Sequence, residues 1–407
     1  MSKENFLKEI RKGIDRIRIA GSEITIAHHN DADGLTSAAT LQISLTRAGF
    51  SARRICIERV HPPIIARIHE EAASSIIYVD LGAQAAPEIS VANKGRCATL
   101  ILDHHHPNAP TDPKVLNIAT EKFGLSGDMD ISASTAAYFF ALELDEKNRD
   151  LAYLGVLGAV GDEHDREGAL IKENRAALMD AVEQGHVQIE MDADGKERYF
   201  LARFGNPIPM APLAISVTTL GGVGYYSDGP DLGVRVCLEG LFPTAQKRLE
   251  ELRKIQQKAY EKTTARLRQD GFHETKHIQW FNIGDDFSPM GVKIIGEYCW
   301  DIRNEDFIDP EKYIVGFQNM DPAIPNLGTF DWSQTKVSMR LPTPLERKVV
   351  AKTMPGLTYL VPGAARQVGG SIDACHDYTA ATIVDIGKEE ALIAEMDKLV
   401  QEKLMKK

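Results

Sequence analysis

The sequence predicts an α/β protein with an N-terminal parallel-sheet domain, a smaller C-terminal α/β domain and a long helix joining them. Over residues 1–165, short apolar runs rich in β-branched residues alternate with helix-length segments. From Thr244 to Asp270 there is no Gly or Pro, and apolar residues recur at helical spacing. A second alternation of strand-like and helix-like segments follows. The predicted divisions are a core at 1–165, a helical extension at 166–242, a linker helix at 243–271 and a second domain at 272–407.

Composition narrows the class of protein. The 407 residues are 43% hydrophobic and 26% charged, as in globular proteins, and no run of about 18 apolar residues predicts a membrane-spanning helix. The charged, amphipathic N-terminus does not resemble a signal peptide. Five cysteines form no Cys-x-x-Cys pair, so we expect reduced thiols in a cytoplasmic protein without a membrane partner.

The formal net charge of −11 argues against a passive coat on nucleic acid, which would be basic. Bound divalent cations would nevertheless reverse the field inside a group of aspartates. The charge therefore remains compatible with a metal-dependent enzyme acting on phosphate esters.

The N-terminal elements follow one another at ordinary lengths. The predicted helices cover 3–20, 34–48, 64–72, 131–146 and 150–160, and the predicted strands cover 23–28, 54–60, 75–80 and 98–103. Ser132 or Ser134 is a suitable N-cap for the fourth helix. This alternation favours a parallel sheet with helices on both faces.

Acidic and imidazole side chains lie at the ends of three of these strands. They are His28, His29, Asp31 and Asp33 at the end of the first strand, Asp80 at the end of the third, and Asp103, His104, His105 and His106 at the end of the fourth. Carboxyl ends of parallel strands meet at one edge of a sheet, where ligand sites gather. Crowded carboxylates repel one another unless a cation lies among them. A polar strand end with a helix N-cap is the alternative explanation for the first group alone.

A fourth acidic group, which includes Asp162 and His164, ends the apolar segment 150–160. It is either a solvated helix end or a place where a cation offsets acids that the helix dipole opposes. Carboxylates mixed with imidazole suit Mn²⁺, and Mg²⁺ or Zn²⁺ less well. A carboxylate shared by two ions about 3.5–4 Å apart is typical of phosphoester cleavage.

The C-terminal part has predicted strands at 277–283, 313–320 and 336–341 and predicted helices at 290–302 and 388–405. Between them lie Gly369 and Gly370, then His376 and small residues expected to open a helix. This arrangement could hold a phosphate. It could equally be a loop beside a buried histidine.

The ordered motifs resemble those of the DHH phosphoesterase superfamily. They are His29-x-Asp31-x-Asp33-Gly34, Asp80, Asp103-His104-His105 and Asp162. The C-terminal part resembles the DHH-associated domain, whose mark is a Gly-Gly-Gly-His loop, although Ala374 and Cys375 precede His376 here.

The resemblance implies roles for these residues. One metal would be bound by His29 and Asp31, and the other by Asp33, His104 and Asp162, with Asp80 bridging. His105 would contact the scissile phosphate, and Asp103 would orient a ligating histidine. His376, Arg340, Gly369 and Gly370 would bind phosphate from across a cleft between the domains. No role follows for His28, His106 or His164.

The overall plan resembles archaeal RecJ-like nucleases. This implies an exonuclease with two Mn²⁺ ions, with Mg²⁺ as the alternative ion, which degrades single-stranded DNA or RNA to mononucleotides and works with replication or repair proteins. The alternatives are a phosphodiesterase for short oligoribonucleotides or cyclic dinucleotides, and a non-catalytic scaffold in a replication complex.

Overall fold

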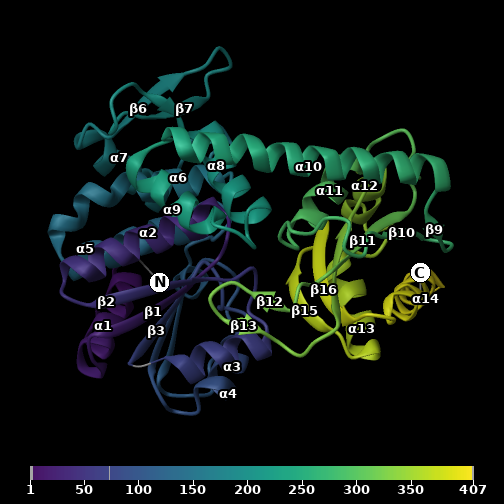
Figure 1. The fold of residues 1–407 in the computed structure, drawn as a ribbon, viewed down its shortest axis with the longest axis horizontal. Coiled ribbons are helices and arrows are strands. Elements are labelled where there is room, and N and C mark those ends of the chain that lie inside the picture. The colour runs from purple at the N-terminus through teal and green to yellow at the C-terminus, as the bar shows by residue number, and fades with distance from the viewer. Residues whose placement is uncertain (1–2, 73, 406–407) are drawn as a thin grey trace. The chain divides into compact units, whose positions relative to one another are not determined.

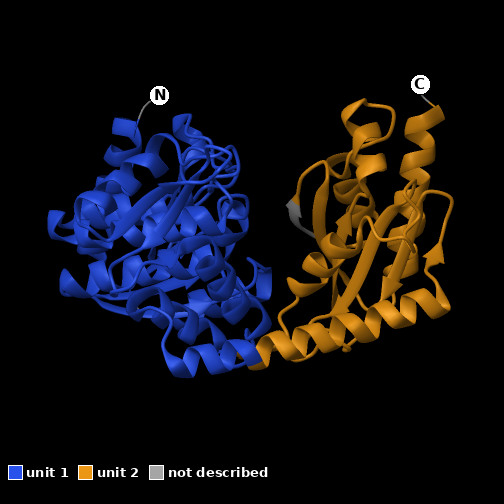
Figure 2. Ribbon diagram, turned by 90° about the horizontal axis from the view of Figure 1, so that it is seen from above, with its two compact units in different colours: residues 1–250, 325–327 blue, residues 251–324, 328–407 orange. Residues whose placement is uncertain are grey.

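The computed structural model describes residues 3–72 and 74–405. The chain divides into two compact units (Figure 2): unit 1 contains residues 1–250 and 325–327, and unit 2 contains 251–324 and 328–407. In the described part of the chain, no helix is both long and apolar enough to cross a membrane.

Unit 1 is built on a five-stranded sheet, of which Figure 1 labels β1, β2 and β3. Its strands lie in the order β2-β1-β3-β4-β5, and all neighbouring strands are parallel. The strands are β1 (Glu23–His28), β2 (Ser51–Cys56), β3 (Ser75–Val79), β4 (Ala98–Asp103) and β5 (Val115–Ala119). The central strands are buried along nearly their whole length, which explains their continuous apolar sequence. At the carboxyl edge, His28 pairs with Cys56 on one side and Val79 on the other.

Helices cover both faces of this sheet. The helices around it are α1 (Lys3–Ala20), α2 (Ala32–Arg47), α3 (Pro62–Glu71), α4 (Ala86–Asn93), α5 (Ala133–Leu144) and α6 (Ala152–Gly161). The connection from β1 to β2 crosses the sheet in one direction, and the connections from β2 to β3 and from β3 to β4 cross it in the opposite direction. Right-handed crossovers therefore place α2 on one face and α3 with α4 on the other. Helices α2, α5 and α6 all pack against one another on the α2 face.

The remainder of unit 1 extends this helical layer. It comprises η1 (Thr120–Phe123), η2 (Glu146–Leu151), α7 (Lys172–Glu183), a small antiparallel sheet of β6 (Val187–Met191), β7 (Glu197–Leu201) and β8 (Ile208–Pro209), then α8 (Met210–Val223) and α9 (Gly229–Glu239). Helix α10 (Pro243–Asp270) then runs for 28 residues and passes from unit 1 into unit 2.

Unit 2 has a six-stranded mixed sheet in the order β15-β16-β14-β11-β10-β9. Its strands are β9 (His273–Glu274), β10 (Ile278–Asn282), β11 (Tyr313–Asn319), β14 (Gln334–Arg340), β15 (Ser371–Cys375) and β16 (Thr379–Asp385), and β12 (Ala323–Ile324) pairs separately with β13 (Gly328–Thr329). Only β10 and β11 pair in parallel among the described strands of this sheet.

The core of unit 2 lies between this sheet and three helices, α12 (Thr343–Val350), α13 (Leu357–Val368) and α14 (Glu389–Met405). Phe317, Leu360 and Met396 are among its fully buried members. Each such side chain contributes about 1.5–3 kcal/mol relative to an exposed one. Helix α11 (Ile294–Ile302) packs against β11 and β14.

The predicted fold class is confirmed: an N-terminal parallel sheet, a long helix and a C-terminal mixed-sheet domain. Three local predictions were wrong. The strand expected at 54–60 is β2 at Ser51–Cys56, whose first residues alternate between exposed and half-buried at the edge of the sheet. The helix expected from 290 begins at Ile294. Residues expected to open a helix after His376 instead start β16, because they pair with β14.

Candidate metal centre

The predicted ligands gather at the carboxyl edge of the unit 1 sheet. His29, Asp31 and Asp33 follow β1, and Asp80 follows β3. Strand β1 leads to β2 on one side while β3 lies on its other side, so the strand order reverses between β1 and β3. Ligands of open α/β sheets bind at such a switch point, beyond the strand ends.

The turn after β1 is shaped by the first motif. Asp31 is the N-cap of α2, and its Oδ1 accepts a hydrogen bond from Gly34 N at 3.1 Å. A Cβ at Gly34 would lie 2.6 Å from His29 O, so only glycine fits. His29 Nδ1 lies 2.8 Å from Asp31 Oδ2 and 3.5 Å from Asp80 Oδ2. The motif thus brings one imidazole and two carboxylates together.

Asp33 is only 2% exposed and is held by another helix. Its Oδ2 accepts from Ala133 N at 2.8 Å, and its Oδ1 accepts from Ser134 N at 3.0 Å, in the first turn of α5. A Cβ at Gly158 of α6 would lie 2.5 Å from Asp33 Oδ1, so glycine allows this close approach. Burial, followed by the charges of Asp80 and Asp162, raises the pKa of Asp33 to about 8.

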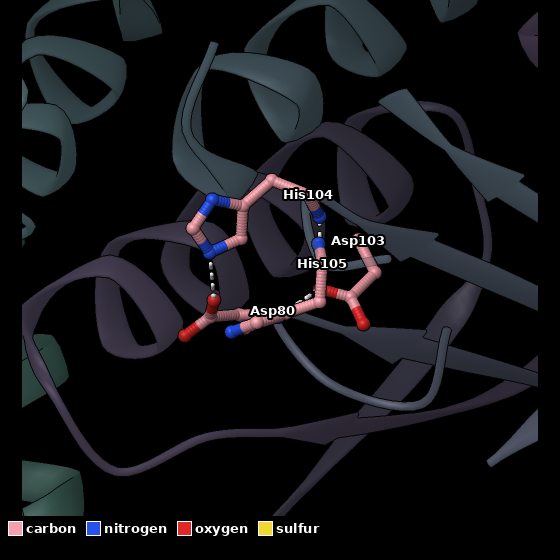
Figure 3. Close-up of side chains that lie close together, drawn as sticks. All are labelled: Asp80, Asp103, His104 and His105. Atoms are coloured by element: carbon pink, nitrogen blue, oxygen red, sulfur yellow. Dashed lines mark hydrogen bonds and ion pairs between the residues drawn. The ribbon is translucent and has the colours of Figure 1, made fainter. Parts of the chain in front are cut away.

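Asp80 lies between the β1 and β4 groups. Its φ of 62° places it in the left-handed region as the chain leaves β3. Its Oδ1 lies 3.4 Å from His104 Nε2, and Figure 3 shows the His104 ring directed at this carboxylate. Among the described residues, Asp80 Oδ2 has no hydrogen-bond partner. A buried carboxylate oxygen without a donor is suited to a cation.

Asp103 organises the motif at the end of β4. Its Oδ1 accepts from His104 N at 2.8 Å and from His105 Nδ1 at 2.7 Å (Figure 3). Its Oδ2 accepts from Ala83 N at 2.8 Å. Burial alone would raise the pKa of Asp103, but His105 and His104 hold it below its ordinary value. Asp103 is thus an ionised acceptor that holds the His105 imidazole and the His104 backbone.

The two histidines of this motif differ in their surroundings. His104 is buried, and its Nδ1 donates to Gly127 O at 2.6 Å, which leaves Nε2 facing the carboxylates. Burial alone would lower the pKa of His104, but Asp80 and Asp162 raise it well above its usual value. His105 has a side chain 43% exposed, and its Nε2 is not used in the bond to Asp103.

The last acidic residue stands at the end of α6. Asp162 is the C-cap of that helix, and its Oδ2 lies 3.8 Å from His104 Nε2. His164 Nε2 lies 3.0 Å from the same oxygen. Burial alone would raise the pKa of Asp162, but the hydrogen bond with His164 lowers it. The sequence had assigned no role to His164, since its contacts depend on a helix that follows it.

The described residues form three overlapping clusters of donor atoms, each spanning less than 4.8 Å. We call them the β1 cluster (His29, Asp31, Asp80), the β4 cluster (Asp80, Asp103, His104, His105) and the α6 cluster (His104, Asp162, His164). Asp80 and His104 each belong to two of them. Carboxylate oxygens with imidazole nitrogens suit Mn²⁺ or Mg²⁺. Asp80 Oδ2, which lies 3.5 Å from His29 Nδ1 and accepts no hydrogen bond from a described residue, is available to such an ion. Asp33 is near these acids but belongs to none of the clusters.

Comparison with protein families matches the segment that supplies most of the donors of this centre, whereas Asp162 and His164 lie just beyond it. Residues 23–159 match the family model described as "DHH family, N-terminal domain". The chain contains a DHH domain. A search of curated proteins found no significant match.

Several solved structures resemble nearly the whole chain. RecJ from Thermus thermophilus in complex with Mn²⁺ has a TM-score of 0.58 and 16% identity over 97% of this chain and 55% of that one. Exonuclease RecJ bound to manganese has a TM-score of 0.57 and 16% identity, over 97% and 94% of the two chains. CDC45 from Entamoeba histolytica has a TM-score of 0.58 and 9% identity, over 97% and 99%. At these identities the likeness shows the fold alone. The chain spans about half the length of the Thermus protein.

The predicted phosphate-binding residues lie outside the DHH domain, in unit 2. Arg340 is the last residue of β14 and pairs with Thr379. The carbonyl of Thr379 accepts a hydrogen bond from His376 N at 2.8 Å, so Arg340 and His376 lie at the same end of the strands. Gly369 ends α13 with φ 76°, and Gly370 N donates to Ala365 O. Strand β15 separates these glycines from His376, so the structure does not gather all four residues.

Two further histidines of the DHH domain, His28 and His106, belong to none of the three clusters. His28 is buried at the end of β1, and its Nδ1 lies 2.8 Å from His29 O. Burial lowers the pKa of His28 to about 3, so it is neutral. His106 is exposed. The sequence left both without a role.

Proposed function

We propose that this protein is a two-metal phosphodiesterase. The observation that carries the proposal is the meeting of the β1 and α6 clusters around Asp80 and His104, at the switch point of the DHH-domain sheet. Four separated chain segments bring hard oxygen and imidazole donors to one place. No serine or cysteine nucleophile is needed for this chemistry.

The residues divide between two ions, Mn²⁺ or Mg²⁺. His29 and Asp31 would hold one ion, Asp33, His104 and Asp162 the other, with Asp80 shared. Bound in this way, two ions lower the pKa of a water and offset charge on the phosphate oxygens. Asp103 is not assigned to an ion, because its Oδ1 accepts from the His105 ring and it is proposed to orient that ring instead.

His105 is the proposed contact to the scissile phosphate. The bond from its Nδ1 to Asp103 fixes the ring, and Nε2 is left to donate to a phosphate oxygen. Burial alone would lower the pKa of His105, but Asp103 raises it, which favours the cationic form. His105 would be the catalytic residue, and Asp103 its positioning residue.

The finer proposal is an exonuclease that releases mononucleotides from single-stranded DNA or RNA. Its support is the fold shared with manganese-bound exonuclease RecJ and the DHH domain at 23–159. Arg340 and His376 are proposed to bind substrate phosphate, as are Gly369 and Gly370. Replication or repair proteins are the proposed partners.

The test is digestion of end-labelled single strands of DNA and RNA with Mn²⁺, beside a dinucleotide and a cyclic dinucleotide. We expect a ladder of shortened strands and free mononucleotides, and no activity in Asp80→Ala. Cleavage of the dinucleotides alone would replace the exonuclease by the oligoribonuclease or cyclic-dinucleotide alternative. Failure to hydrolyse any of them with any divalent ion would favour a scaffold.

A further inference from the structure

The segment Gly127–Ser134, which runs into the first turn of α5, contributes no donor to the three clusters. It nevertheless contacts His104, which belongs to two of them, and the neighbouring Asp33. Gly127 O accepts from His104 Nδ1 at 2.6 Å. Ala133 N and Ser134 N donate to the two oxygens of Asp33. A Cβ at Gly127 would lie 1.8 Å from His104 O, so the segment follows the backbone of His104 closely.

The same segment reaches Asp162 indirectly, through Asn174 of α7. Asn174 Oδ1 accepts from Ser132 N at 3.1 Å, and Asn174 Nδ2 donates to Met129 O at 3.2 Å. These two backbone groups decide which end of the amide is oxygen and which is nitrogen. Nδ2 therefore faces His164 Nδ1, 2.8 Å away.

The orientation of Asn174 assigns the His164 tautomer. Because Nδ1 accepts from Asn174, the ring proton of the neutral imidazole lies on Nε2. Nε2 then donates to Asp162 Oδ2 at 3.0 Å. A protonated ring nitrogen cannot bind a metal. His164 is 1% exposed and lies in the α6 cluster, but its geometry is that of a residue that orients a ligand.

We propose that the segment Gly127–Ser134, extended by Asn174 and His164, positions one of the two ion sites, and that His164 is a positioning residue for Asp162. The proposal rests on the proposed two-metal function. The framework holds the three residues assigned to one ion: Asp33, His104 and Asp162. Asp31, assigned to the other ion, is held by a different contact, the bond from Gly34 N. Loss of His164 should therefore weaken the binding of one ion and leave the binding of the other unchanged.

The experiment counts bound Mn²⁺ by calorimetry and electron paramagnetic resonance, without any substrate. We expect two ions in the wild-type protein. In His164→Leu, one should bind about 10–100-fold more weakly while the other is unchanged. His164→Gln, which keeps an N–H donor, should recover most of the loss. His69→Leu removes a similarly buried histidine from α3, outside the clusters, and should retain both affinities.

The tautomer itself is tested by nitrogen NMR of the metal-free wild-type protein, which needs no variant. We expect the His164 proton on Nε2. A proton on Nδ1 would overturn the positioning role, and so would wild-type affinity for both ions, or equal loss of both, in folded His164→Leu. A wild-type protein that binds no Mn²⁺ but has the expected tautomer would refute the two-metal function instead.

Discussion

Replacing Asp80 by asparagine should separate the charge at the metal centre from its shape. Asp80 has φ 62°, which asparagine tolerates better than most residues, so Asp80→Asn keeps the backbone and the side-chain volume. It removes the carboxylate that lies 3.5 Å from His29 and 3.4 Å from His104. It also removes a charge that, after burial, raises the pKa of Asp33.

The magnitude follows from linkage. An ion that binds only the folded chain at one hundred times its Kd stabilises that chain by about 2.7 kcal/mol, so two ions contribute about 5 kcal/mol. Because Asp80 is assigned to both ions, Asp80→Asn should lose most of this gain. Without metal, the loss of repulsion toward Asp33 and the loss of attraction to His104 oppose each other, so the variant should differ much less from the wild type than it does with Mn²⁺.

The assay is urea and thermal unfolding with and without saturating Mn²⁺. Asp112→Asn is the matched control, because Asp112 is a buried aspartate that accepts from Asn93 and Gly95 N outside the clusters. We expect it to lower stability in both conditions and keep the full Mn²⁺ gain. A wild-type Mn²⁺ gain in Asp80→Asn would refute the bridging role.

Three other predictions address separate parts of unit 1. Gly34→Ala, whose Cβ would meet His29 O at 2.6 Å, should weaken Mn²⁺ binding at least tenfold by calorimetry, and unchanged affinity would contradict the packing argument. His105→Gln should slow phosphodiester hydrolysis by about 100- to 1000-fold with both ions still bound, whereas loss of the ions would argue against a substrate contact. Burial lowers the pKa of His69 in the folded chain to about 4. As the pH falls below the ordinary pKa of histidine, the unfolded chain therefore takes up a proton at this residue before the folded chain does. Urea unfolding should therefore show a loss of about 2 kcal/mol between pH 7 and 5 that is missing in His69→Leu, and equal slopes would disprove this linkage.

The sequence predicted the parts of the structure that depend on local pattern. Buried parallel strands are continuous apolar runs, so β1, β3 and β4 and the polar residues after them were recognisable. Topology then implied that Asp80 and Asp103 share an edge with the first motif. Strand β2 was misplaced because an edge strand alternates and its polar residues weaken the signal.

The remaining features depend on contacts between distant residues. The hydrogen bonds from the α5 backbone to Asp33 join residues 100 and 101 positions apart, and no local sequence pattern predicts them. The role of His164 depends on Asn174, ten residues later on another helix. In the second unit, Thr379 starts a strand because β14 offers a partner, and a run of small residues alone does not reveal this.

The residue at the position of Gly158 predicts whether a related chain can form the complete metal centre. A side chain there would meet Asp33 Oδ1 at 2.5 Å and Ser134 Oγ at 2.2 Å, so α6 could no longer approach both. A homologue that keeps every acid and histidine of the site but has a bulkier residue at this position should bind fewer ions. The identity of this one helical residue would therefore distinguish active homologues from inactive ones whose motifs are unchanged.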